Sequence, residues 1–129
     1  MQALVETIRQ EIPELAGVYV FGSQASGSTH PDSDLDLAIL AGARQDPAQL
    51  WELAQRLAVS AGNDVDLIDL RAASTVMRMQ VVSGGKRLFC SDTVACERFE
   101  DLVYSEFVLL NEERAGILDD IRRRQRVYG

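Results

Sequence analysis

The chain has 129 residues, of which 47% are hydrophobic and 26% are charged, proportions typical of soluble globular proteins, so a disordered or membrane-embedded protein is excluded. This length predicts one compact domain over residues 1–129, with a core of about residues 1–90 and a C-terminal helix at about 92–126. The formal net charge of -7 argues against direct binding to nucleic acid, because such binding depends on lysines and arginines that neutralise phosphates.

The N-terminal segment and the cysteines indicate the compartment. No stretch approaches the roughly 18 apolar residues that a membrane-spanning helix requires. Residues 1–6 lack the basic head and the apolar run of a secretory signal. We therefore expect a cytoplasmic protein with no membrane partner. Cys90 and Cys96 lack zinc-ligand spacing, and in a reducing compartment they are expected to be free thiols.

The first half of the chain predicts one helix and two strands. Apolar residues at helical spacing favour a helix over about residues 2–11, before Pro13. The β-branched and aromatic run 18–21 predicts a strand that stops at Gly22. Residues 23–33 have the composition of a loop, and residues 35–40 read as a buried strand.

The second half alternates helices with strands and ends in a long helix. We expect a helix from Pro47 to Gly62, a strand over 65–70, a helix over about 72–83 and a short edge strand over 86–90. The terminal helix is expected to close the fold. The predicted fold class is α/β, a small mixed β-sheet with flanking helices.

Five polar or small residues lie where these strands begin or end. Gly22 and Ser23 follow the first strand, Asp34 and Asp36 begin the second, and Asp66 lies near the start of the third. A helical crossover predicts that the second and third strands are parallel, and the short link predicts that the first and second are antiparallel. All five residues should therefore gather at one rim of the sheet.

The aspartates at this rim indicate a metal site. By strand alternation Asp34 and Asp36 share one face, Asp64 and Asp66 share one face, and Asp69 points the other way. Crowded carboxylates repel one another unless a proton or a cation intervenes. Oxygen ligands without His or Cys suit Mg²⁺, which commonly binds one or two carboxylates together with substrate phosphates.

This arrangement predicts transfer chemistry at phosphorus. Two Mg²⁺ ions would stabilise the attacking oxygen and the departing pyrophosphate. Ser23 would bind the phosphates, and Gly22 would let the backbone approach them. Gly-Ser alone is usually a turn and Asp-x-Asp alone is usually a solvated strand end, but their combination with a third aspartate is far more specific.

Other residues are interpreted as structural. Trp51 is expected in the core rather than as a base-stacking platform. Arg71 lies about a strand length from the carboxylates and is expected to pair with an acid at the surface. His30, Asp32 and Ser33 are expected to be solvated loop residues.

The terminal helix has an apolar stripe that is wider than one packing face. Val108 and Leu109 lie outside the main stripe. They make this helix a candidate surface for a homodimer or for another partner.

The motif Gly-Ser, spacer, Asp-x-Asp and later third carboxylate resembles the nucleotidyltransferase superfamily that includes DNA polymerase beta. Within it, residues 20–27 (VFGSQASG) and 64–71 (DVDLIDLR) look most like the minimal nucleotidyltransferase (MNT) antitoxins. This resemblance covers most of the chain. It includes residues 73–76 and the pair Gly85 and Lys86.

The resemblance implies a protein AMPylase. In that family the partner is a HEPN toxin, typically a ribonuclease, and the antitoxin transfers AMP from ATP to a toxin tyrosine. Carried over, Gly22 and Ser23 would bind the nucleotide phosphates, Asp34 and Asp36 would ligate two Mg²⁺ ions, and Asp66 would supply the third carboxylate. The choice of ATP rests on this resemblance alone.

Two alternatives remain open at this point. The chain could be an antitoxin that blocks its toxin by direct binding without chemistry. It could also be a small-molecule nucleotidyltransferase of the aminoglycoside-modifying type. The small-molecule alternative is the weaker of the two, because the aminoglycoside-modifying proteins generally carry an extra domain for the acceptor.

Overall fold

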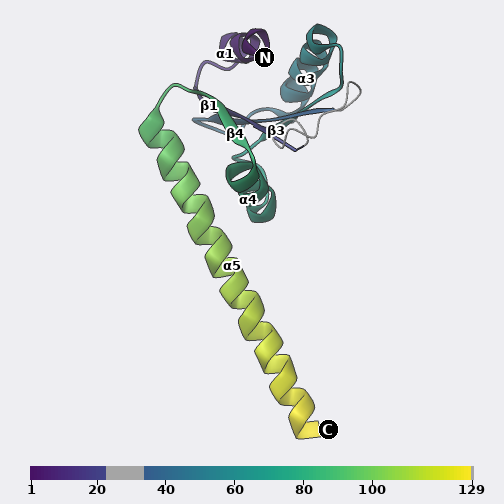
Figure 1. Cartoon of the computed structure of the whole chain (residues 1–129), viewed down its shortest axis with the longest axis vertical. Coiled ribbons are helices and arrows are strands. Elements are labelled where there is room, and N and C mark those ends of the chain that lie inside the picture. The colour runs from purple at the N-terminus through teal and green to yellow at the C-terminus, as the bar shows by residue number, and fades with distance from the viewer. Residues whose placement is uncertain (23–33, 129) are drawn as a thin grey trace.

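A four-stranded mixed sheet forms the centre of the molecule. The computed structural model describes residues 1–22 and 34–128. Strands β1 (Leu15–Phe21), β2 (Leu35–Ala41), β3 (Val65–Asp69) and β4 (Lys86–Cys90) lie in the order β3-β2-β1-β4 (Figure 1). β1 is antiparallel to β2 and β4, and β2 is parallel to β3. The predicted strand directions are therefore confirmed, although β1 begins earlier than expected.

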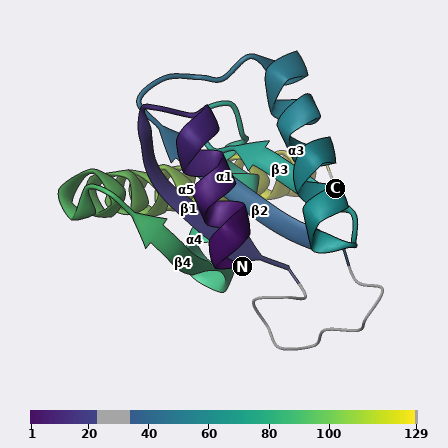
Figure 2. The same cartoon turned by 90° about the horizontal axis from the view of Figure 1, so that it is seen from above.

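Within residues 1–22 and 34–128, four helices cover the two faces of this sheet. Helices α1 (Gln2–Glu11) and α3 (Pro47–Ala61) lie on one face, side by side (Figure 2). Helices α4 (Thr75–Gly84) and α5 (Thr93–Tyr128) lie on the other (Figure 1). The predicted helices are confirmed, with α4 starting at Thr75 because the Ser74 hydroxyl accepts the Met77 N–H.

Local sequence sets the limits of α3. The Asp46 side chain accepts the Gln49 N–H at the N-terminus, and Pro47 occupies the first turn, where its missing N–H costs nothing. At the other end Gly62 adopts a left-handed conformation with φ 75°, which glycine tolerates without strain. These two signals fix the ends of α3, the helix that connects the parallel strands β2 and β3.

Strand alternation divides the core into two layers. On the α1 and α3 side the sheet contributes residues such as Val18, Leu37 and Leu67. On the α4 and α5 side it contributes Tyr19 and Leu40, among others. Because side chains alternate along a strand, even-numbered positions of β2 and β3 belong to the second side.

The ends of β2 and β3 far from the predicted site are locked by polar contacts. Asp69 is buried, and its carboxylate accepts the N–H of Gln45 at 2.8 Å and of Arg71 at 3.0 Å. The Arg71 Nε donates to the Ala41 carbonyl at 2.8 Å. The expectation that Arg71 pairs with an acid is not met among the described residues, where its Nε binds this backbone carbonyl instead.

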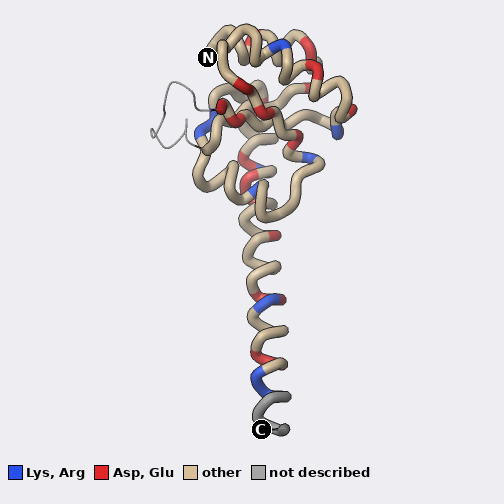
Figure 3. Tube along the Cα trace, turned by 90° about the vertical axis from the view of Figure 1, so that its right-hand side faces the viewer, with Lys and Arg blue, Asp and Glu red and all other residues tan. Residues whose placement is uncertain are grey.

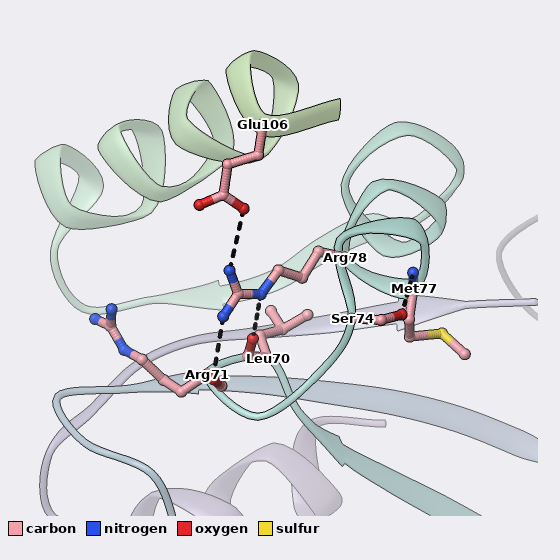
Figure 4. Close-up of polar contacts among 6 residues, drawn as sticks. All are labelled: Leu70, Arg71, Ser74, Met77, Arg78 and Glu106. Carbon is pink, nitrogen blue, oxygen red and sulfur yellow. Dashed lines mark hydrogen bonds and ion pairs between the residues drawn. The ribbon is translucent and has the colours of Figure 1, made fainter. Parts of the chain in front are cut away.

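Arg78 joins α4 and α5 to the end of β3. Its guanidinium donates to the carbonyls of Leu70 at 2.8 Å and Arg71 at 3.0 Å, and it pairs with Glu106 at 3.3 Å (Figure 4). The planar, forked guanidinium suits three acceptors arranged in this way. Arg78 therefore holds α4, α5 and the residues that follow β3 together, at the end of the strands far from the predicted site.

Helix α5 packs on the sheet only along its first part. Cys96, Phe99 and Val103 are buried, and beyond them the helix projects away from the other elements (Figure 1). Exposed apolar residues, Ile117 and Leu118 among them, occupy this projection alongside charged positions of both signs (Figure 3). The expectation that the whole helix closes the fold is wrong for this second part.

The two cysteines lie where β4 meets the start of α5. Both are free thiols, as predicted, and the Cys90 thiol donates to the Cys96 sulfur at 2.9 Å. Burial raises the pKa of Cys96 to about 12, so this group stays protonated at neutral pH. Within the part of the chain that the structure describes, no helix has the length and apolarity needed to cross a bilayer.

Candidate active site

Strand pairing brings the predicted residues to one rim of the sheet. Asp36 on β2 and Asp66 on β3 are direct partners in the parallel register. Phe21, the last residue of β1, pairs with Asp36, so Gly22 follows immediately beside that carboxylate. Asp34 lies just before the first residue of β2. Four of the five predicted site residues therefore converge.

The fifth residue, Ser23, falls in the range 23–33, outside the described residues. The same range contains His30, Asp32 and Ser33. The structure tests none of these predictions.

Gly22 is required by its own backbone and by its neighbour. Its φ is +71°, a region that residues with a side chain rarely adopt. A Cβ atom built on Gly22 would also collide with a carboxylate oxygen of Asp36. The sequence predicts glycine here because of a bound phosphate, whereas the structure shows a second reason, the close approach of Gly22 to Asp36.

The aspartates influence one another electrostatically. Burial raises the pKa of Asp36, and the negative charges of Asp66 and then Asp34 raise it further. Asp36 is half-buried, whereas Asp34 and Asp66 are exposed to solvent. A half-buried carboxylate near two others favours whatever neutralises it, either a proton or a cation. The rim is therefore suited to bind positive charge.

The donor set restricts which cation fits. All three side chains offer carboxylate oxygens, which suit a hard ion such as Mg²⁺ rather than zinc. Across residues 1–22 and 34–128, no three acidic, histidine or cysteine side chains are close enough to form a complete metal site. A cation held by Asp34, Asp36 and Asp66 would thus need further oxygens, and substrate phosphates supply such ligands to Mg²⁺.

Trp51 lies at the surface of α3, contrary to the prediction. Its side chain is 65% exposed, so its placement in the core is wrong. Leu53 and Leu57 occupy the buried stripe of α3, and Trp51 lies about 200° around the helix from Leu53 at 100° per residue. That angular offset is the sequence signal that identifies Trp51 as a surface residue.

Comparison with known proteins identifies the family of this chain. Residues 2–94 match the model of the family described as polymerase beta, nucleotidyltransferase. The chain is 42% identical over 118 residues to the protein adenylyltransferase MntA of Shewanella oneidensis, with 92% of this chain and 84% of MntA covered.

Solved structures give the same result. A crystal structure of a toxin–antitoxin with AMP-PNP contains a chain with 42% identity and a TM-score of 0.85, covering 93% of this chain and 96% of that one. A structure of the tri-AMPylated Shewanella oneidensis HEPN toxin in complex with the MNT antitoxin matches with 39% identity and a TM-score of 0.79, covering 93% of each chain.

Proposed function

This chain belongs to the polymerase beta nucleotidyltransferase family, and we propose that it is an antitoxin that transfers AMP from ATP to a tyrosine of a cognate HEPN toxin. One observation carries the proposal. Asp36 and Asp66 are paired in register beside Gly22, in a chain that resembles a protein adenylyltransferase over 92% of its length. Transfer of AMP to the toxin would neutralise it.

Each residue at the rim has a role in this proposal. Gly22 and Ser23 bind the phosphates of ATP. Asp34 and Asp36 would hold two Mg²⁺ ions, and Asp66 would supply the third carboxylate. Burial, together with the charges of Asp66 and Asp34, raises the pKa of Asp36. This supports the assignment, because such a carboxylate favours cation binding. Bound Mg²⁺ supplies positive charge that stabilises the phosphates during transfer.

The transfer is a displacement at the α-phosphorus of ATP. The tyrosine oxygen forms a bond to this phosphorus, and the bond from the phosphorus to the oxygen that bridges to the β-phosphate breaks. Pyrophosphate leaves with the electron pair of that bond. Asp66 is exposed at the start of β3, where it can accept the proton that the tyrosine hydroxyl loses.

The test is to incubate the purified chain with its HEPN toxin, labelled ATP and Mg²⁺. We expect label on the toxin, a mass increase equal to one or more AMP groups, and loss of toxin activity. Asp36→Asn should abolish the labelling. Omission of Mg²⁺, with EDTA present, should do the same, and unchanged labelling in EDTA would contradict the metal assignment.

Direct binding is a second candidate mechanism, because the projecting part of α5 exposes apolar residues. Val108 is 55% and Leu109 is 56% exposed, and such residues on a helix suit a protein contact. The same experiment separates the two mechanisms. If Asp36→Asn neutralises the toxin as well as the wild type does, binding suffices and the catalytic account is wrong.

A further inference from the structure

A groove lies between α3 and the outer edge of β3. It has a volume of about 400 Å³, within the range of sites that bind small molecules or peptide side chains. Its walls come mainly from these two elements: Leu50, Trp51 and Ala54 from α3, and Val65, Asp66 and Leu67 from β3. Three consecutive strand residues line it, so the groove follows the strand edge rather than one face of the sheet.

The groove is continuous with the candidate active site. Asp34 and Asp66 line it. We assign Asp34 to the metal, and we assign Asp66 to the metal and to the proton of the reacting hydroxyl. Its wall includes a large exposed aromatic residue, Trp51, at 65%. A large aromatic surface left in water in a groove that also includes Asp34 and Asp66 is typical of a contact residue, since tryptophan is enriched among residues that dominate binding energy.

The order of the strands decides which substrate this groove receives. Gly22 directly follows β1, Asp36 lies on β2, and Asp66 lies on β3, so Gly22 and the groove are on opposite sides of Asp36. In a displacement at phosphorus the attacking and leaving oxygens are roughly in line on opposite sides. With the pyrophosphate held near Gly22, the attacking hydroxyl approaches from the side of Asp66 and the groove.

The position of β3 in the sheet suits an extended protein segment. In the described part of the chain β3 is a terminal strand, paired only with β2, and α3 lies beside it (Figure 2). A terminal strand presents backbone N–H and C=O groups at its outer edge, and extended peptides add to such edges. Backbone pairing gives affinity in this mode, and side-chain pockets give specificity.

We propose that the groove binds an extended segment of the acceptor protein next to the modified tyrosine, with Trp51 as its apolar anchor. Trp51 is then a specificity residue for the protein acceptor and has no role in binding ATP. The inference rests on the proposed function, because it assumes that the acceptor is a protein. It gives a role to the only tryptophan of the chain, which is exposed and lines the groove.

The first test compares Trp51→Ala with Glu52→Ala. Glu52 is the next residue of α3, is exposed and lies outside the groove, so it controls for changes to the helix. At saturating ATP, Trp51→Ala should raise KM for the HEPN toxin about tenfold or more, while Glu52→Ala should change it little. The dissociation constant for a non-hydrolysable ATP analogue should stay the same in both. A loss of ATP affinity with an unchanged KM for the toxin would show a base-binding site and overturn the inference.

A second test does not require catalysis. Incorporation of 5-fluorotryptophan gives a single ¹⁹F resonance, because the chain has one tryptophan. This resonance should shift or broaden when unlabelled HEPN toxin is added and should be unchanged by the ATP analogue alone. A resonance that responds only to the analogue, or to neither, would overturn the inference. Absence of labelled toxin in the transfer assay would instead overturn the proposed function, so the two failures are distinguishable.

Discussion

Two aspartates three positions apart on β3 have opposite surroundings. Asp69 is buried, and two backbone N–H groups, those of Gln45 and Arg71, satisfy its carboxylate. Asp66 is exposed and is the direct strand partner of another carboxylate, Asp36. At the Asp69 end of the strand, the carboxylate accepts hydrogen bonds that hold the neighbouring segments together. At the Asp66 end, two carboxylates are strand partners, so negative charge is concentrated there.

This contrast separates structural from functional acids. A carboxylate that accepts backbone N–H groups stabilises the fold, and its removal leaves those donors unpaired. A carboxylate placed against other carboxylates destabilises the fold until something positive binds. The identity of the residue is the same in both cases, and only the neighbours distinguish the roles.

The largest expected effect is on catalysis at the charged rim. Asp36→Asn should lower the rate of AMP transfer by about 10³-fold or more, comparable to the loss of a key electrostatic group in other enzymes. Single-turnover labelling of the HEPN toxin measures this. Asp69→Asn is the matched control on the neighbouring strand and should retain most of the activity. Equal losses of AMP transfer in Asp36→Asn and Asp69→Asn would contradict the division into a functional end and a structural end of the strands.

The next largest effect is expected at Gly22, where both the fold and the site require glycine. Its φ is positive, and Asp36 lies close to it. Gly22→Ala should destabilise the protein by about 1–3 kcal/mol because of its positive φ. It should also reduce AMP transfer, since the added Cβ displaces the Asp36 carboxylate. Denaturant unfolding and the labelling assay measure the two effects. Gly62→Ala provides the control, because Gly62 has a similar φ of 75° but a Cβ added there would meet nothing within 4 Å, so it should lose stability without losing activity.

A smaller effect, on stability alone, is expected at the buried end. Asp69→Ala should lower the free energy of unfolding by about 1–3 kcal/mol, because the N–H groups of Gln45 and Arg71 lose their acceptor. Urea denaturation measures the loss. The kcat for AMP transfer should be close to that of the wild type at temperatures where the variant is folded.

The smallest expected effect concerns pH in the absence of divalent cations. Because burial and the neighbouring aspartates raise the pKa of Asp36 in the folded state, its ionised form costs stability above that pKa, and the cost disappears as the pH falls through it. Asp36→Asn should therefore be more stable than the wild type at neutral pH in EDTA, and the difference should shrink on acidification. Thermal unfolding across this pH range measures it.

Added Mg²⁺ provides the complementary measurement. At a concentration about 100 times its dissociation constant, a ligand of the folded state stabilises it by about 2.7 kcal/mol. Mg²⁺ with an ATP analogue should thus raise the Tm of the wild type more than that of Asp36→Asn. Equal shifts would contradict the assignment of Asp36 as a ligand.

Much of this arrangement could be predicted from the sequence because it depends on local patterns. The apolar runs and the helical crossover predict the parallel pairing of β2 and β3, and this pairing places Asp36 opposite Asp66. Because side chains alternate along a strand, Asp66 and Asp69 point to opposite faces, and this distinguishes the candidate ligand from the structural residue. Each of these inferences needs only the period of the side chains and the direction of the strands.

The errors have a common physical cause. The contact of Arg71 with the Ala41 carbonyl and the exposure of Trp51 depend on how elements distant in sequence pack, which no local pattern contains. The collision between a Cβ at Gly22 and Asp36 similarly depends on the distance between two strands. The apolar residues of α5 keep a helical period whether or not anything covers them, so periodicity predicted the helix but not its packing.

The uneven packing of α5 has a consequence for its local stability. This helix has 36 residues and a length of about 54 Å at about 1.5 Å per residue. The part that includes Phe99, Val103 and the Arg78–Glu106 pair is anchored to the sheet, whereas helical segments without tertiary contacts are marginal in water. Amide hydrogens before about residue 107 should therefore exchange with solvent slowly, and those further along should exchange quickly in the isolated chain. A bound protein that covers the projection would be detected as slowed deuterium uptake there.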